Sequence, residues 1–531
     1  MKLKTLLAVA AAALTLAACN KQPEPAPTPE TTLSVNPTSY EFKADDVNVA
    51  QEFTVTSNAA WQATAPADVD WFTVAEGNGK GNGKFKVTVT KKNEAQEARS
   101  AKVTVKADTK TVEVAVSQAA APLPPADPTK IKTAQQFVDE LLLKDHSTIA
   151  SRDTTYTIEA DLDFKDVVLP GYDAKIQYFY ANINGQNHSI LNYVGDGPMF
   201  RSICGTVQDL TFDKSCSAKF TNHSGGILCY ENALGYFKNI VNNAPITIEP
   251  SVSETSHFGG IMGVNRAYVE DCVNNGEIAF NSDVKKQARV GGIVGSFAGN
   301  NVDGGVFVKG DVTVMKNCAN NANITITFTD GGANAQQEFV GGICGFFETK
   351  DHGEGAVNEM SGCVNKGAII NATTATIAKE PKLTIGGVIA CRKGGTNDET
   401  GVVANCSNTG ELDGGINSIA IVGGLIGEIR LGSLNMKPTF DNCQVSCDIK
   451  VASATNEFAG IVCGKFMTGT GTAGVGLENA PVYVAKSSVS CNGEKTEVNE
   501  SNLETLRYGS NEQSMEVATE KITTYVKFGS K

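Results

Sequence analysis

A short motif of small and apolar residues recurs seven times between Ser224 and Gly464. Each copy has two small residues, an aliphatic residue, another apolar residue and a third small one. The copies begin at Gly225, Gly259, Gly291, Gly341, Gly386, Gly423 and Ala459, and we call this the glycine motif. Their spacing varies between 32 and 50 residues, which indicates one structural unit with loops of different lengths. A repeat of this kind predicts a solenoid.

A second motif, the cysteine motif, lies between successive copies of the first. Its cysteines are Cys272, Cys318, Cys363, Cys406 and Cys443, and each has Ile or Leu six positions later. Asn follows the first four cysteines at the second position, and Val445 takes its place in the last copy. The patterned residues stand at even offsets from each cysteine, which predicts a strand, a tight bend and another strand. We expect the Asn and Gly residues at the bend, because they accept left-handed backbone.

Three short strands per unit predict one coil of a parallel β-helix, with like residues stacked in columns. The third position of the glycine motif, always Ile, Val or Leu, is the predicted inward column. The fourth position is also apolar, so which of the two faces the opposite wall stays open. We expect a right-handed parallel β-helix over residues 131–480 and a C-terminal cap over 481–531. A helix at Thr133–Leu143, with Thr133 as N-cap, should close the first coil.

Residues 32–120 follow a different pattern, in which apolar and polar residues alternate. Phe85, Val87 and Val89 alternate with polar residues, and Val112, Val114 and Val116 do the same further on. Alternation interrupted by a Gly-rich turn predicts an immunoglobulin-like antiparallel β-sandwich, so the whole chain is expected to be all-β. Residues 121–130 are rich in Pro and Ala and form the predicted linker.

The sandwich segment resembles a BACON domain. The resemblance rests on the strand at 33–35, on 57–61 ending in Trp61, on Trp71, on Arg99 and on the closing strand at 114–118. The family name stands for a carbohydrate-binding association in surface proteins of gut bacteria. The resemblance therefore implies either glycan binding or a spacer role. Trp61 and Trp71 are candidate sugar-stacking residues, although tryptophan within an alternating strand more commonly anchors the core.

The chain opens with features of an export signal. Lys2 and Lys4 precede an apolar stretch that is too short to span a bilayer stably. The sequence at 16–19 resembles a bacterial lipobox, which implies cleavage after residue 18 and lipidation of Cys19. Residues 19–31 alternate Pro with polar residues and predict an extended tether. We expect a lipoprotein of the outer membrane of a Gram-negative bacterium that faces the cell exterior.

Composition narrows the functional classes. The 531 residues carry a formal net charge of −13, so binding to nucleic acid through bulk charge is not expected. Thirteen of the fourteen cysteines follow Cys19, and their parallel arrangement in the coils favours a ladder of buried thiols over disulfides. Cys443 and Cys447, and Cys204 with Cys216 or Cys229, are the candidate exceptions. No HExxH, GxSxG or phosphate-loop motif occurs, and no metal or cofactor is expected.

The segment from Thr155 to about Gly464 resembles GLUG-type β-helix repeats, which implies an adhesive or scaffold role. Tyr172, Phe179, Tyr193 and the candidate sugar-binding residues Tyr178 and Tyr180 form the densest aromatic group. Asp161 and Asp163 alternate as paired acids do, yet they fall within the opening motif of the repeat. A cluster of Asp351, Glu354, Asp398 and Glu399, with Arg392 and Lys393 nearby, fits a solvated loop or a lyase site.

The sequence therefore predicts a surface lipoprotein that binds a host or dietary glycan, or a glycoprotein, without catalysis. The alternatives are a carbohydrate-active enzyme on the same scaffold, either a polysaccharide lyase or a glycosidase, and a purely structural stalk. The long inserts at 295–316 and 346–361 are the expected contact surfaces, because binding residues concentrate on loops.

Overall fold

The computed structural model describes most of the chain after residue 28. The described residues are 29–122, 127–249, 255–283, 287–298, 302–303, 306–307, 312–329, 336–349, 357–374, 383–394, 401–416, 419–430, 439–453, 458–467, 473–475, 478–509 and 522–531. They consist mainly of strands and turns, so the predicted all-β class is confirmed. Two compact units divide the chain between Ala126 and Asp127. The predicted signal peptide and Cys19 lie outside the described residues.

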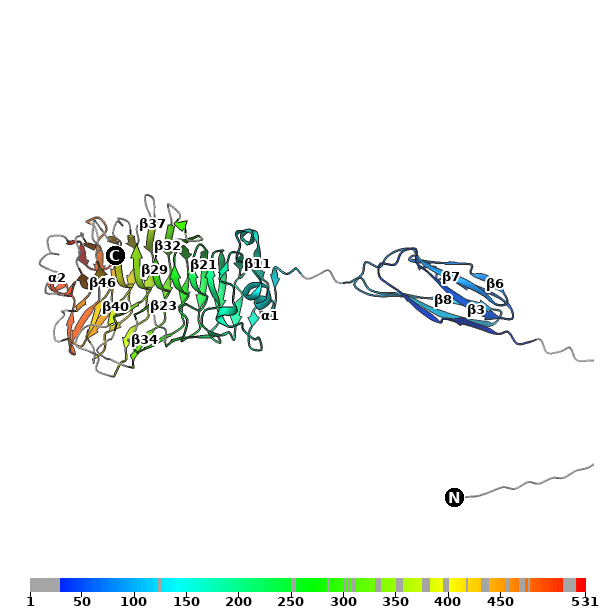
Figure 1. Ribbon diagram of the computed structural model, residues 1–531, viewed down its shortest axis with the longest axis horizontal. Coiled ribbons are helices and arrows are strands. Elements are labelled where there is room, and N and C mark those ends of the chain that lie inside the picture. The colour runs from blue at the N-terminus through cyan, green and yellow to red at the C-terminus, as the bar shows by residue number, and fades with distance from the viewer. Residues whose placement is uncertain are drawn as a thin grey trace, which may run out of the picture. The chain divides into compact units, whose positions relative to one another are not determined.

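The first unit is a sandwich of two sheets with its own core (Figure 1). Sheet A has the order β1 (Leu33–Asn36), β3 (Ala50–Ser57), β7 (Gly83–Val89), β5 (Phe72–Ala75). Sheet B has the order β2 (Ser39–Phe42), β9 (Lys110–Gln118), β8 (Arg99–Ala107), β4 (Ala60–Thr64), β6 (Asn78–Lys80). Pairing is antiparallel as predicted, except that β2 runs parallel to β9. The alternating Val and Phe side chains meet in the core, where Phe53 stacks on Phe85.

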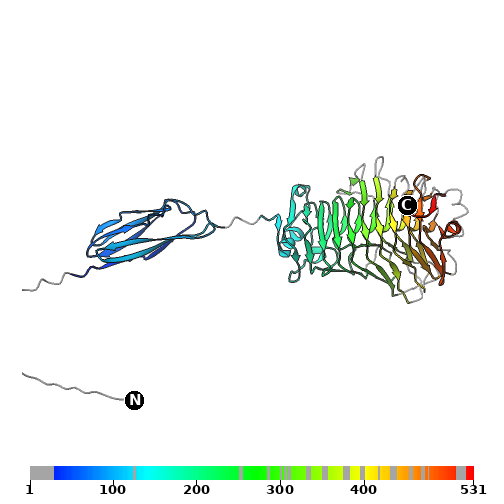
Figure 2. The same ribbon diagram turned by 180° about the vertical axis from the view of Figure 1, so that it is seen from behind.

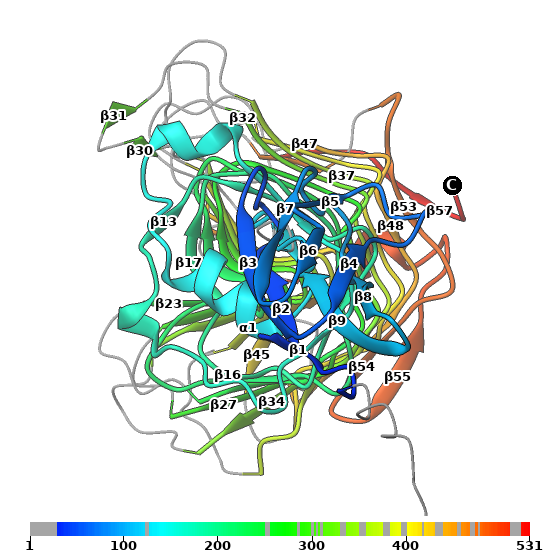
Figure 3. The same ribbon diagram turned by 90° about the vertical axis from the view of Figure 1, so that its right-hand side faces the viewer.

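The second unit is a stack of coils in which strands pair in parallel with the coil before and after (Figures 1 and 2). One coil contains β28 (Ala288–Gly291) in sheet F, β29 (Val294–Ala298) in sheet D, β32 (Val312–Lys316) and β33 (Ala319–Asn320) in sheet C, and β34 (Ile324–Phe328) in sheet E. Figure 3 looks along the stack, where strands of one sheet lie behind one another.

The register shows that each glycine motif belongs to one coil. Sheet F consists of β23 (Ser256–Gly259), β28, β35 (Glu338–Gly341), β40 (Leu383–Gly386), β45 (Ala420–Gly423) and β50 (Ala459–Gly460). Gly259, Gly291, Gly341, Gly386, Gly423 and Gly460 stand opposite one another in a single column. The next two motif positions, such as Ile293 and Val294, are both fully buried in the core of the unit. The predicted inward column is confirmed.

The role predicted for the Asn of the cysteine motif is wrong. The left-handed residue at the corner is the one before the cysteine, as at Asp271, Asn317, Asn405 and Asn442. The Asn two positions after the cysteine is fully buried and forms a ladder instead. Asn242, Asn274, Asn320, Asn365 and Asn408 donate in turn to the side-chain oxygen of the next, over 2.8–2.9 Å. Both roles suit Asn, so spacing alone did not separate them.

This ladder explains why the glycine motif needs glycine. A Cβ on Gly342 would lie 2.1 Å from the carbonyl oxygen of Gly387 and 2.3 Å from Cγ of Asn365. A Cβ on Gly345, the third small residue, would lie 2.6 Å from the backbone nitrogen of Val290. The turn between sheets F and D therefore packs directly on the Asn ladder, and the following strand packs on the backbone of sheet F.

Both ends of the stack are covered. The predicted helix is present as α1 (Ala134–Phe137) followed by a π-helical turn at Val138–Leu143, and Thr133 Oγ1 accepts a hydrogen bond from the backbone of Gln136. Phe137 and Leu141 are buried in the core below it. At the far end, β53 (Val482–Val484) and β54 (Ser488–Cys491) extend sheets C and E, so the predicted cap contains further rungs. Residues 506–507 then cover Ile461 and Val462.

Candidate carbohydrate-binding surface

The outer face of sheet C carries two columns of side chains, which are half-buried except for the buried Val314. The strands involved are β18 (Val207–Phe212), β21 (Tyr236–Asn242), β25 (Tyr268–Glu270), β32 and β37 (Val357–Ser361). One column holds Gln208, Lys238, Glu270, Lys316 and Ser361, and the other holds Tyr236, Tyr268, Val314 and Glu359. Parallel register places these residues on adjacent rungs, so they form one continuous surface.

Two tyrosine rings lie next to each other on this surface. The centroids of Tyr236 and Tyr268 are 5.0 Å apart, and the rings are inclined at 72° in an edge-to-face pair. The ammonium group of Lys316 lies 6.0 Å from the centroid of Tyr268. Both rings are half-buried, since each packs on the sheet and presents the remainder to solvent. An aromatic ring held in this way can stack on the C–H face of a sugar.

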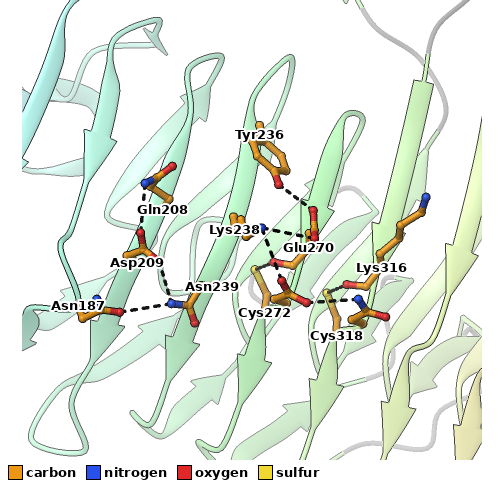
Figure 4. A network of polar contacts seen from close by, with 12 residues as sticks. Asn187, Gln208, Asp209, Tyr236, Lys238, Asn239, Glu270, Cys272, Lys316 and Cys318 are labelled. Atoms are coloured by element: carbon orange, nitrogen blue, oxygen red, sulfur yellow. Dashed lines mark hydrogen bonds and ion pairs between the residues drawn. The ribbon is translucent and has the colours of Figure 1, made fainter.

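Charged groups lie next to Tyr236 (Figure 4). The hydroxyl of Tyr236 donates to Glu270 Oε2 over 2.7 Å, and Lys238 Nζ lies 3.5 Å from Glu270 Oε1. One rung further, Lys316 Nζ lies 3.6 Å from Glu359 Oε2. Glu270 therefore holds the hydroxyl of Tyr236, and the Lys–Glu pairs leave carboxylate and ammonium groups at the surface, where they can hydrogen-bond to sugar hydroxyls.

The left-handed corner residues extend this network along the stack. Asn239 donates to Asp209 Oδ1 over 2.8 Å, and Asn317 donates to Asp271 Oδ1 over 3.3 Å (Figure 4). Lys238 Nζ also lies 4.0 Å from Asp271 Oδ2. Side-chain hydrogen bonds thus link two pairs of corners, Asp209 with Asn239 and Asp271 with Asn317. The result is a row of amides and carboxylates beside the tyrosines.

The carboxyl groups of this surface are suited to accept hydrogen bonds. The hydrogen bond from Tyr236 lowers the pKa of Glu270, and burial together with that same bond raises the pKa of Tyr236. Glu270 is therefore ionised at neutral pH, whereas the acid of a glycosidase must be protonated. Burial raises the pKa of Glu338 to about 8, but that side chain is fully enclosed inside the unit.

The sequence prediction missed Tyr236 and Tyr268. Tyr268 stands four residues before Cys272, and Tyr236 stands four residues before Ile240, which takes the place of the cysteine in the preceding coil. This even offset belongs to the outer face. The corresponding positions in the next copies are Val314 and Glu359. An aromatic residue at an outward position in two successive copies was the available signal.

Most rings of the aromatic group predicted in the first coils are buried or stacked on other side chains. Tyr180 is buried, and the guanidinium of Arg152 lies 5.2 Å from its ring centroid. Tyr172 stacks on His223 at a centroid distance of 4.0 Å. Phe179 is fully buried, whereas Tyr178 is 38% exposed. Of the two predicted sugar-binding tyrosines, Tyr178 is thus the one whose ring a ligand can reach.

The acidic candidates serve as links between coils. Asp161 Oδ1 accepts from the backbone of Ser189 over 2.8 Å, and Asp163 Oδ1 accepts from the side chain of Asn192 over 2.8 Å. The bond from Asn192 lowers the pKa of Asp163. Asp351, Glu354, Asp398 and Glu399 lie outside the described residues. Lys393 pairs with Glu348, and Arg392 is buried inside the unit.

The predicted thiol ladder is present. Cys272, Cys318, Cys363, Cys406 and Cys443 are fully buried and carry free thiols, as does Cys447. The thiol of Cys406 donates to the carbonyl of Ala404 over 3.4 Å, and burial raises its pKa well above the usual range. A thiol in this state is a poor nucleophile and metal ligand. Within the described ranges, no three His, Cys, Asp or Glu side chains converge to hold a metal.

Comparison with known families concerns the first unit. Residues 32–121 match the model of a family described as the viral BACON domain. The first unit is a BACON domain. The match extends over the whole sandwich and agrees with the resemblance found in the sequence. A search of curated proteins returned no match.

Three solved structures show limited similarity to the chain. A xyloglucanase of Bacteroides ovatus in complex with a heptasaccharide is 18% identical over 27% of this chain and 29% of its own, with a TM-score of 0.16. A candidate immunoglobulin A1 protease of Bacteroides ovatus is 16% identical over 77% and 85%, with a TM-score of 0.34. An IgA1 protease is 13% identical over 86% and 29%, with a TM-score of 0.37. These values are too low to transfer any activity.

The tryptophans of the BACON domain face its core. Trp61 is buried, donates its indole N–H to the carbonyl of Gly81 over 2.8 Å, and packs beneath Gly79. Trp71 is buried against Phe72, and Arg99 lies 4.8 Å from its ring centroid. A ring enclosed in this way has no face on which a sugar can stack. Neither side chain is placed to act as the predicted sugar platform.

In the described part of the chain, no helix is both long and apolar enough to cross a bilayer.

Proposed function

We propose that this protein binds carbohydrate without catalysis, through the outer face of sheet C. The observation that carries the proposal is the half-buried pair of Tyr236 and Tyr268, set among ionised Glu270 and Lys238. Aromatic faces next to fixed hydrogen-bonding groups match the two surfaces of a sugar ring, which has apolar C–H bonds and polar hydroxyls. The BACON domain supports a carbohydrate-related role.

The ligand is a glycan of host or dietary origin, or the sugar of a glycoprotein. Tyr178 is a second proposed contact, because its ring is exposed at the N-terminal end of sheet D. An ionised Glu270 cannot supply the proton that the general acid of a glycosidase must give to the leaving group. The protein is thus proposed not to be an enzyme, to need no cofactor and not to bind nucleic acid.

We further propose that lipidated Cys19 anchors the protein in the outer membrane, facing the cell exterior. The second unit then presents its surface on GLUG-like coils wound as a right-handed β-helix, which the parallel pairing supports. Replacing Cys19 with Ala should shift the protein from the membrane fraction to the soluble fraction of cells. Retention of the variant in the membrane fraction would contradict the lipid anchor.

A glycan array with residues 20–531, which is the mature protein without its lipid-bearing Cys19, tests the binding function. The wild-type protein should bind a restricted set of glycans, and the double variant Y236A/Y268A should bind them at least tenfold more weakly. The variant Y236F keeps the ring and loses only the bond to Glu270, so it should retain most of the affinity. Y40A is the matched control, because Tyr40 is a 38% exposed tyrosine of the other unit.

Other results would favour the alternatives. New reducing or unsaturated ends in the incubated glycans would identify an enzyme. Full binding by Y236A/Y268A, with binding lost in Y40A, would place the contact on the BACON domain. No binding to any glycan would leave the structural stalk as the explanation.

A further inference from the structure

A separate pocket of about 500 Å³ opens on the outer face of sheet E. It lies over three adjacent rungs, β44 (Leu412–Asp413), β49 (Asp448–Val451) and β54, where Asp413, Lys450 and Ser490 stand opposite one another. The lining residues are Asp413, Gly415, Ile416, Lys450, Val451, Ala452, Ser490, Asn492 and Gly493. It is on a different sheet from the tyrosine pair.

The pocket arises because β44 is a short strand. It pairs through only two residues, whereas β49 and β54 have four each. After Asp413 the chain turns away at Gly415, whose φ of 83° suits glycine, and Asp413 Oδ1 fixes this turn by accepting from the Gly415 backbone. The turn places Ile416 beside the space left beyond β44, and this side chain is 84% exposed. The hairpin turn at Asn492 and Gly493 forms the opposite wall.

The polar groups of the pocket are available to a ligand. Asp413 Oδ1 is used by the turn, which leaves Oδ2 as an acceptor. Among the described residues, no protein group hydrogen-bonds to the side chains of Ser490 or Asn492. Lys450 is already paired with Glu411, so its charge is balanced outside the pocket. The available set is one acceptor, one hydroxyl and one amide, with apolar surface from Ile416, Val451 and Ala452.

We propose that this pocket binds a single sugar unit, such as the end of a glycan chain. A carboxylate oxygen, an amide and a hydroxyl can hydrogen-bond to neighbouring sugar hydroxyls, while the apolar residues receive the C–H face. A volume of about 500 Å³ is large enough for one or two sugar rings. The inference rests on the proposed carbohydrate-binding function. It adds a separate subsite that binds the terminal sugar of a glycan chain.

Ligand-observed NMR with free glucose, galactose, mannose and N-acetylglucosamine tests the pocket in the mature protein. At least one sugar should show saturation transfer with wild type. S490F fills the pocket and should abolish the signal, and D413N should weaken the affinity about tenfold while its amide oxygen still holds the turn. T325F is the matched control, because Thr325 is exposed in the same outward column of sheet E, two rungs before Asp413.

The results separate this pocket from the surface on sheet C. If the wild-type signal persists in S490F and D413N, the pocket is not the sugar site. If wild type shows no signal with any of the four sugars, the proposal is also overturned. If the glycan array is positive and Y236A/Y268A abolishes that binding, the proposed function stands in either case. If the array is negative but S490F removes a monosaccharide signal, the pocket stands and the proposed function fails. A melting curve checks that S490F is folded, and D413N carries the test if it is not.

Discussion

A single buried amide can hold three coils together. Asn320 donates to the carbonyl of Ala322 in its own coil and to Asn365 in the next, and its oxygen accepts from Asn274 in the previous one. These groups are enclosed, so each lost partner leaves a polar atom that water cannot reach. The ladder therefore fixes the register of the stack residue by residue.

Replacing Asn365 with Val should destabilise the second unit. Valine fits the column in volume, since Val445 occupies the same position one rung after Asn408. The change removes the acceptor of Asn320 and the donor to Asn408, at a cost of roughly 1–3 kcal/mol for each stranded group. Urea unfolding measures the effect. N321V is the control, because Asn321 forms a similar amide contact at the exposed surface, and an equal loss in both variants would contradict the ladder.

Glu338 should make stability depend on pH. Burial raises its pKa to about 8 in the folded protein, and the bonds from Ser282 and the Ala288 backbone only partly offset this. Between the unfolded pKa, near 4.5, and about 8, the folded state holds a proton that the unfolded state has lost. This contribution to the free energy of unfolding should therefore fall by about 1.4 kcal/mol per pH unit as pH rises through that window.

The variant E338Q tests this dependence. Glutamine has the same shape and stays neutral, so unfolding curves between pH 5 and pH 8 should lose that slope and show a more stable protein at pH 8. E277Q, at the exposed residue just before the sheet E strand Ile278–Ser282, should keep the wild-type slope. A slope unchanged in E338Q would mean that Glu338 does not retain its proton.

At the scale of elements, the turn between sheets F and D sets the shape of each coil. G342A should destabilise the second unit by about 1–3 kcal/mol or more, because its Cβ would lie 2.1 Å from the Gly387 carbonyl. Thermal unfolding measures the change. G171A is the control, since a Cβ there meets nothing within 4 Å, and similar melting of the two variants would contradict the close packing.

The sequence was sufficient for the strands and their columns, and less so for contacts between coils. Even spacing around the cysteine predicted the strands, and the Ile of the glycine motif predicted the core. Hydrogen bonds between Asn residues more than forty positions apart, such as Asn320 and Asn365, depend on register and carry no local signal. The tyrosine pair on sheet C and the pocket beside the short β44 also form only when the register places residues of different coils side by side. For this reason neither could be predicted from local sequence.

For the whole molecule, the two units have separate cores, joined by a segment rich in Pro. F85A should therefore lower the stability of the BACON domain by roughly 3–5 kcal/mol, because Phe85 is fully buried against Phe53. Differential scanning calorimetry of the mature protein should show one transition shifted and the other unchanged. F280A, a buried phenylalanine of the second unit, should give the opposite pattern. Glycan binding through sheet C should survive F85A at a temperature at which the BACON domain has melted, and its loss there would show that the units act together.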